Sequence, residues 1–328
     1  MIQTITTYSL KIGLLILVIN GSVSCAHKDL DFGGSDGTAQ IRFDWSDVAN
    51  AQPNGMLLIV FKGSSQPVNL PFVESWGGSV RLPAGNYQMI AHNDNLSNVI
   101  AWGDSWQEYR LYAQSTEINS FSRMFAGTRV VPRSAGTEEQ SVIFEPDLIW
   151  TAAVPEAIID KRSSITMLMK EVTEEYVFTI SETKNLENVV EIVGTLSGMA
   201  ESYLPVLQKS ENYSCIIPFN LASDGQSIRG RVRTFGNRCS EYYLEHGDVE
   251  HKLTIYILLK DNSKYFATFD VTDAINEAQQ EAYVSGIDSE IPLSIVIDEF
   301  VIPEPMLDDS GLNASVDEWK EVNINISM

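Results

Sequence analysis

The sequence has few basic residues and no apolar run long enough to cross a membrane. Its 328 residues include 22 Lys and Arg against 44 Asp and Glu, which gives a formal net charge of −22 at pH 7. A surface this acidic repels the phosphates of nucleic acids and of anionic membranes. We therefore expect no nucleic-acid partner, and no membrane contact through basic side chains.

The apolar run near the start extends from Ile12 to Ile19, directly after Lys11. A transmembrane helix needs about 20 apolar residues, so this run is too short to span a bilayer but suits the core of a secretory signal. Small residues then lead to Cys25. A signal that is cleaved after lipid attachment needs a cysteine at the first mature position. We therefore predict a lipoprotein signal peptide over residues 1–24 and a lipid on Cys25. The alternative is an ordinary signal followed by an incidental cysteine.

Cysteine is scarce, with 3 in the whole chain. If Cys25 carries a lipid, Cys215 and Cys239 remain in an exported, oxidising setting. A disulfide between them would close a loop of about 25 residues and stabilise the fold by roughly 3–4 kcal/mol. The sequence does not fix their separation in space, so a Cys215–Cys239 disulfide and two buried free thiols are both open.

The chain length predicts about two domains. Residues 25–38 are rich in Gly and Asp and read as a flexible tether. Short segments of alternating polarity, separated by turn residues, follow along the rest of the chain. They predict an all-β protein of two tandem antiparallel β-sandwiches, over residues 39–152 and 153–328, with one short helix at 273–284. A turn at Pro83-Ala84-Gly85 is expected to join two antiparallel strands.

Residues for catalysis or metal binding are not arranged in a recognisable motif. Ser197 lies between two glycines, but the spacing differs from the Gly-x-Ser-x-Gly nucleophile elbow. The stretch "EHGDVEH" at 245–251 gathers carboxylates and two histidines, and we interpret it as a solvated hairpin tip. We therefore expect no enzyme activity, no metal site and no cofactor.

Three aromatic residues, Trp102, Trp106 and Tyr109, lie close in sequence to Asp94 and Asp104. Exposed aromatic rings with nearby carboxylates can stack on sugar rings and bond their hydroxyls. The cluster therefore suggests glycan contact. The alternative is that these rings pack in the core of a sandwich.

Several segments, in this order, resemble the fimbrillin-like lipoproteins of Bacteroidales, in particular the fimbrial anchor or accessory subunits. The segments are "IRFDWS", "GMLLIVF", "LPAGNYQMIAHND", "VVEIVGTLSGMA", "LLKDNSKYFATFDVTDAI" and "SVDEWKEVNINISM". The resemblance implies two transthyretin-like β-sandwiches. It also implies fimbrial subunits as partners and a lipid-anchored, surface-exposed place at the outer membrane, to which Lys28-Asp29 after the lipid site would direct the chain.

In that family, stalk subunits lose their first strand to an arginine-directed protease, and the groove left behind accepts a strand from the next subunit. Arg42 is the only arginine between Cys25 and Arg81, and it lies inside the predicted first strand, Ala39–Trp45. This favours an anchor or accessory subunit that keeps its lipid and first strand. The predicted last strand, Glu321–Met328, could complete its own sandwich or be donated to a neighbour. The alternative function is a glycan-binding surface lipoprotein module.

Overall fold

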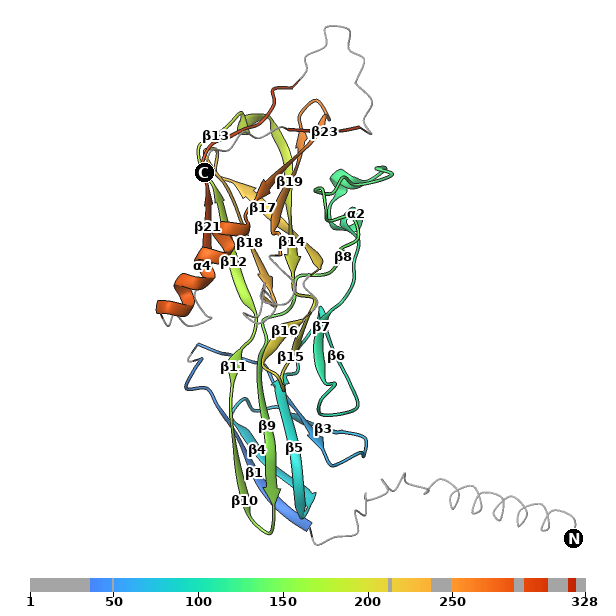
Figure 1. The fold of residues 1–328 in the computed structure, drawn as a ribbon, viewed down its shortest axis with the longest axis vertical. Coiled ribbons are helices and arrows are strands. Elements are labelled where there is room, and N and C mark those ends of the chain that lie inside the picture. The colour runs from blue at the N-terminus through green and yellow to red at the C-terminus, as the bar shows by residue number, and fades with distance from the viewer. Residues whose placement is uncertain are drawn as a thin grey trace, which may run out of the picture.

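The computed structural model describes residues 36–48, 50–211, 214–236, 249–285, 292–305 and 318–322. Over these residues the chain is mostly β-strand, and it forms two bodies stacked end to end along one long axis (Figure 1). The predicted all-β class is confirmed. The helix expected at 273–284 is α4 (Thr272–Ser285). A further short helix, α2 (Ile118–Phe121), was not predicted.

The N-terminal body is a sandwich of two sheets with strand orders β10-β1-β4 and β11-β9-β5-β2-β3. Apolar side chains from both sheets, among them Ile41, Phe43, Leu58 and Met167, form one buried cluster between them. The strands are β1 (Asp36–Asp44), β2 (Met56–Phe61), β3 (Val68–Phe72), β4 (Gly77–Pro83), β5 (Gly85–Asn93), β9 (Trp150–Ile159), β10 (Ser163–Leu168) and β11 (Lys170–Glu171).

This sandwich differs from the expected one in three places. The boundary expected after residue 152 falls inside β9, and β10 pairs with β1 from the other end of the domain. Residues 36–38, expected in the tether, belong to β1. The turn at Pro83-Ala84-Gly85 passes from one sheet to the other, because β4 pairs with β1 whereas β5 pairs with β2 and β9. Pairing between distant segments leaves no local signal, which is why the sequence pattern missed it.

A small sheet of order β16-β15-β7-β6 lies between the two bodies (Figure 1). It combines β6 (Val99–Trp102) and β7 (Arg110–Ala113) with β15 (Ser202–Leu204) and β16 (Lys209–Glu211). Strands from both halves of the sequence therefore meet in one sheet. The β6–β7 hairpin projects from the side of the molecule.

The C-terminal body is built on a single strand path, β21-β12-β18-β17-β14-β19-β20-β23, with β8 also paired to β17. The first part of β17 pairs with β14 and its last residues pair with β18, so the path folds over on itself. Phe178 and Phe219 meet inside, with ring centroids 5.8 Å apart. The strands are β8 (Ser141–Val142), β12 (Glu174–Ile180), β14 (Val189–Met199), β17 (Cys215–Ser223), β18 (Ile228–Thr234), β19 (Lys252–Leu259), β20 (Lys264–Asp270), β21 (Leu293–Ile297) and β23 (Trp319–Glu321), and β13 (Thr183–Lys184) pairs separately with β22 (Phe300–Val301).

Candidate functional site

The first strand, β1, is the central strand of its sheet. It pairs in parallel with β10 on one edge and antiparallel with β4 on the other. Ala39, Ile41 and Phe43 point into the sandwich and are fully buried or nearly so. Burying an Ile or Phe side chain stabilises a fold by roughly 1.5–3 kcal/mol, so removing β1 would open a long apolar groove at a substantial cost.

Gly77 allows β4 to approach β1 closely. Its φ is +111°, a conformation that side-chain-bearing residues rarely adopt, and a Cβ there would lie 2.1 Å from the Ile41 carbonyl oxygen. Tight packing of β4 on β1 therefore depends on this glycine.

Arg42 has an exposed side chain, but its backbone lies opposite Thr166 of β10 and Gly77 of β4. A protease binds its substrate as an extended strand free of other pairing. Cleavage at Arg42 therefore requires the sheet to open on both edges. Arg42 thus lies inside the first strand, as predicted, and is poorly accessible to a protease.

The last described strand, β23, is short and lies at the edge of the C-terminal sheet, parallel to β20. Trp319 anchors it: the centroid of its ring lies 5.6 Å from that of Phe125 and 5.5 Å from that of Tyr256. The buried Lys264 places its ammonium 5.7 Å from the Trp319 ring centroid. Of the predicted last strand, Glu321–Met328, residues 323–328 lie outside the described residues.

Phe125 belongs to the segment between β7 and β8, residues 114–140, which we name the crossing segment. It packs across the outer face of the C-terminal sheet, where Ile118, Met124 and Phe125 join Val193 and Tyr256 in a separate buried cluster. The sequence pattern did not reveal this role. The closely spaced Phe121, Met124 and Phe125 were the available signal.

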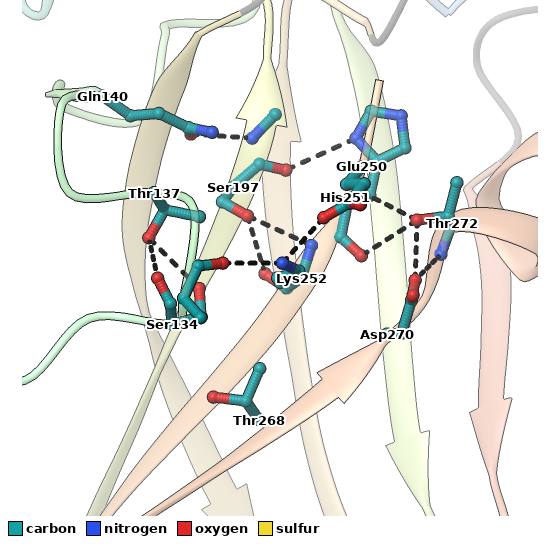
Figure 2. A network of polar contacts seen from close by, with 12 residues as sticks. Ser134, Thr137, Gln140, Ser197, Glu250, His251, Lys252, Thr268, Asp270 and Thr272 are labelled. Atoms are coloured by element: carbon teal, nitrogen blue, oxygen red, sulfur yellow. Dashed lines mark hydrogen bonds and ion pairs between the residues drawn. The ribbon is translucent and has the colours of Figure 1, made fainter. Parts of the chain in front are cut away.

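Polar contacts fasten the crossing segment to the sheet, as Figure 2 shows. The Lys252 ammonium donates to the Ala135 carbonyl at 2.6 Å and pairs with the Glu250 carboxylate at 2.7 Å. The Gly198 amide donates to the Gln140 side chain at 3.1 Å. Nearby, the Tyr256 hydroxyl donates to the Pro132 carbonyl at 2.7 Å, and Lys264 donates to Thr128. The crossing segment and β23 are thus held by the same face of the sheet.

Ser197, His251 and Asp270 lie in this network without forming a catalytic triad (Figure 2). The Ser197 hydroxyl bonds the backbone of Lys252, and the His251 ring faces the Ser197 carbonyl oxygen at 3.3 Å. The Asp270 carboxylate accepts from the Thr272 hydroxyl at 2.6 Å. Burial lowers the pKa of His251 to about 4, against smaller opposing effects of the Ser197 carbonyl and Asp270. The Ser197 hydroxyl thus meets backbone atoms of Lys252, and the His251 ring meets the Ser197 carbonyl rather than the hydroxyl that a triad requires.

The stretch "EHGDVEH" is described only from Val249 onward. Its Glu250 pairs with Lys252, and His251 is buried rather than solvated at a hairpin tip. Within the described ranges, no three His, Cys, Asp or Glu residues are grouped as a metal site. Among the described helices, none is long and apolar enough to span a membrane.

The three aromatic residues suggested for glycan contact are separated by the fold. Trp106 and Tyr109 are buried, each with its ring centroid 5.9 Å from that of Phe61. Only Trp102 is exposed, with the Arg110 guanidinium 5.4 Å from its ring centroid. Trp106 and Tyr109 thus pack in the core, as the alternative to glycan contact expected.

Cys215 is a free, fully buried thiol that donates to the Met199 carbonyl at 3.0 Å. Burial raises its pKa well above the ordinary value, and the negative charge of Glu201 adds to this effect. A neutral thiol is unreactive, so Cys215 has a packing role. Cys25 and Cys239 lie outside the described residues.

Comparison with known proteins gives matches over most of the chain. A family model for a domain of unknown function, DUF5119, matches residues 24–220. A Bacteroides ovatus protein named "Putative fimbrium anchoring subunit Fim4B" is 22% identical over 340 residues, covering 93% of this chain and 92% of that protein.

Solved structures give a similar result. A crystal structure described as a "putative adhesin" from Bacteroides ovatus has a TM-score of 0.58 and 19% identity, covering 93% of this chain and 99% of that one. The fimbrial anchor protein Mfa2 from Porphyromonas gingivalis has a TM-score of 0.47 and 11% identity, covering 81% of this chain and 91% of that one. The resemblance to Bacteroidales fimbrial anchor proteins expected from the sequence is confirmed by the Bacteroides ovatus relative, which matches over nearly the full length of both chains. Because the family model covers more than half of its length, this chain belongs to the DUF5119 family.

Proposed function

We propose that this protein is an outer-membrane surface lipoprotein that acts as an anchor or accessory subunit of a fimbria-like structure. The Bacteroides ovatus relative, similar over nearly the full length of both chains, is named as a fimbrium anchoring subunit. Neither it nor the structural relative described as an adhesin is named as an enzyme. A non-catalytic role, with other fimbrial subunits as partners, follows from this proposal.

The observation that carries the proposal is the double pairing of β1. A subunit that loses its first strand opens a groove and can polymerise, whereas one that keeps it stays attached to whatever precedes that strand. Here β1 is hydrogen-bonded on both edges and buries its apolar face, and Arg42 is paired on both sides. An intact β1 suits a subunit at the base or side of a fibre, with the chain continuous from Cys25.

Retention at the membrane would come from the lipid on Cys25. One acyl chain gives only marginal, reversible binding, and stable anchoring takes more than one. A lipoprotein cysteine carries several. Replacing Cys25 with Ala should therefore release the protein from outer membranes, and a variant that stays firmly bound would contradict lipid anchoring.

Partner contact would use strand edges, where backbone hydrogen bonds give affinity and alternate side chains give specificity. In the N-terminal sandwich, β3 and β4 are the edge strands on one side. In the C-terminal sheet, β23 covers the β20 edge. We propose that the last strand completes its own sandwich, with donation to a neighbour as the alternative.

A denaturing gel tests the assembly. The native protein is solubilised from outer membranes and run with and without boiling, because strand-paired assemblies resist detergent until heated. We expect high-mass bands that contain a second fimbrial subunit and collapse on boiling. A lone band near the mass of the mature monomer in both lanes would contradict the fimbrial role.

A further inference from the structure

A groove of about 340 Å³ lies between the β6–β7 hairpin and the N-terminal sandwich. Leu57, Pro67 and Asn69 line it on the sandwich side. Trp102, Asp104 and Glu108 line it on the hairpin side. None of the residues that line the groove belongs to β1 or to the network of Figure 2, so the assembly contacts discussed above do not account for it.

Trp102 provides a flat apolar surface at the rim. Its side chain is 54% exposed, although large aromatic residues are usually buried. Arg110, directly opposite on β7, holds the ring by a cation–π contact and is itself paired with Glu211 at 3.4 Å. The indole is therefore exposed and also fixed in place.

The loop that carries Asp104 and Glu108 is held rigidly. Trp106 and Tyr109 anchor it in the core, and the Tyr109 hydroxyl lies 2.9 Å from the His92 ring nitrogen. Gly103 has φ of +118°, and a Cβ there would lie 2.6 Å from the Glu108 carbonyl oxygen, so the loop closes tightly on itself. A site that is already ordered loses little entropy when a ligand binds.

Polar groups in the groove have unused bonding capacity. Over the part of the chain that the structure describes, the side chains of Asn69 and Asp104 make no hydrogen bond or ion pair. Glu108 accepts one bond, from the Ser105 hydroxyl at 2.9 Å. Carboxylate oxygens accept bonds from hydroxyl groups, and an amide both donates and accepts.

We propose that this groove binds a neutral carbohydrate chain. The indole face suits the apolar face of a sugar ring, and the amide and carboxylates suit its hydroxyls. The charges of Asp104 and Glu108 repel anionic sugars. A basic peptide is disfavoured because Arg110 already occupies the cation site on the Trp102 ring. The site would give the protein a ligand of its own, whether or not it assembles into a fibre.

Calorimetric titration of the purified full-length chain tests the site. The probes are cellohexaose, xylohexaose, mannohexaose and maltohexaose, with hexagalacturonate as the anionic probe and hexalysine as the cationic one. We expect binding of at least one neutral hexasaccharide, and about tenfold weaker binding by Trp102→Ala. Asn69→Ala should also weaken it.

Trp76→Ala is the matched control, since Trp76 is another exposed tryptophan on the same sandwich and lies outside the groove. It should bind the sugar as the unmodified chain does, and circular dichroism should show all variants folded. The proposal is overturned if no neutral hexasaccharide binds. It is also overturned if Trp76→Ala weakens binding as much as Trp102→Ala, or if hexalysine or hexagalacturonate is the probe that depends on Trp102.

Discussion

At the scale of single residues, the contact between β4 and β1 depends on one missing side chain. Gly77 combines a positive φ with a backbone neighbour, the Ile41 carbonyl, close to where a Cβ would lie. Nothing in the sequence distinguishes Gly77 from Gly78 or from the other glycines in turns. The constraint exists only when a strand from elsewhere in the chain is in place.

Gly77→Ala should destabilise the fold by about 2–4 kcal/mol, because it adds both an unfavourable φ and a backbone clash. Urea unfolding measures the change. Gly63→Ala is the matched control: Gly63 also has a positive φ but an added Cβ meets nothing within 4 Å, so its cost should be about 1 kcal/mol. Equal losses in the two variants would show that the β4–β1 approach does not constrain this position.

The buried His251 links stability to pH. Its pKa is about 4 in the folded chain and about 6.5 in an unfolded one. Above pH 6.5 neither state binds the proton, and the full stability is present. Between pH 6.5 and 4 the unfolded state takes up a proton that the folded state does not, so stability falls as pH falls, by up to about 3 kcal/mol.

His251→Asn keeps a donor near the Ser197 carbonyl and removes the titrating group. We expect the free energy of unfolding of this variant to fall less steeply between pH 6.5 and 4 than that of the unmodified chain, as measured by urea unfolding at several pH values. Burial also lowers the pKa of His92, but this residue is present in both proteins, so its contribution to the pH dependence cancels in the comparison. If the free energy of unfolding changes with pH identically in the two proteins, His251 has the same pKa in the folded and unfolded states.

At the scale of elements, the crossing segment and β23 support each other on one face of the C-terminal sheet. A three-residue edge strand makes few backbone hydrogen bonds, and isolated edge pairing is weak. The aromatic contacts of Trp319 with Phe125 and Tyr256 supply the remaining stability. Removing a ring from either partner should therefore free the same strand.

Phe125→Ala and Trp319→Ala should each raise amide hydrogen exchange in β20 and β23, while β9 and β5 in the other body keep their protection. Because the two rings touch, the double variant should lose less free energy of unfolding than the two single variants lose in sum. Glu321→Ala, at an exposed position on the same strand, is the control and should change exchange little. Unchanged exchange in Phe125→Ala would show that β23 holds without the crossing segment.

At this scale the sequence predicted individual elements better than their partners. Alternation in "IRFDWS" located β1, the continuous apolar run of "GMLLIVF" located β2, and the helix predicted at 273–284 is α4. It did not show that β10 lies beside β1, or that β6 and β7 leave their sandwich for β15. Local polarity sets strand positions, whereas strand neighbours depend on the packing of segments that are far apart in the sequence.

The sequence predicted only part of the candidate site, because the rest depends on how distant segments pack. Arg42 in a strand could be read from its neighbours, because the alternation around it is clear. The separation of Trp102 from Trp106 and Tyr109 could not, because all three are aromatic and close in sequence. Which ring reaches solvent depends on how the hairpin packs against the sandwich.

At the scale of the whole molecule, the two bodies are joined by more than a linker. The sheet β16-β15-β7-β6 draws strands from both halves, and the crossing segment carries the chain onto the C-terminal sheet before it returns to β9. In Figure 1 the described part of β1 starts at the end of the molecule opposite the C-terminal body. With a lipid on Cys25, the C-terminal body would point away from the membrane, toward a fibre.

The central claim is that the chain remains continuous from Cys25 through β1. Intact-mass and peptide mass spectrometry of the native protein, purified from outer membranes, tests it most directly. The account predicts a chain that begins at an acylated Cys25 and contains Arg42 uncut within β1. A mature chain that begins after Arg42, with no lipid-bearing peptide, would contradict it and identify a polymerising subunit instead.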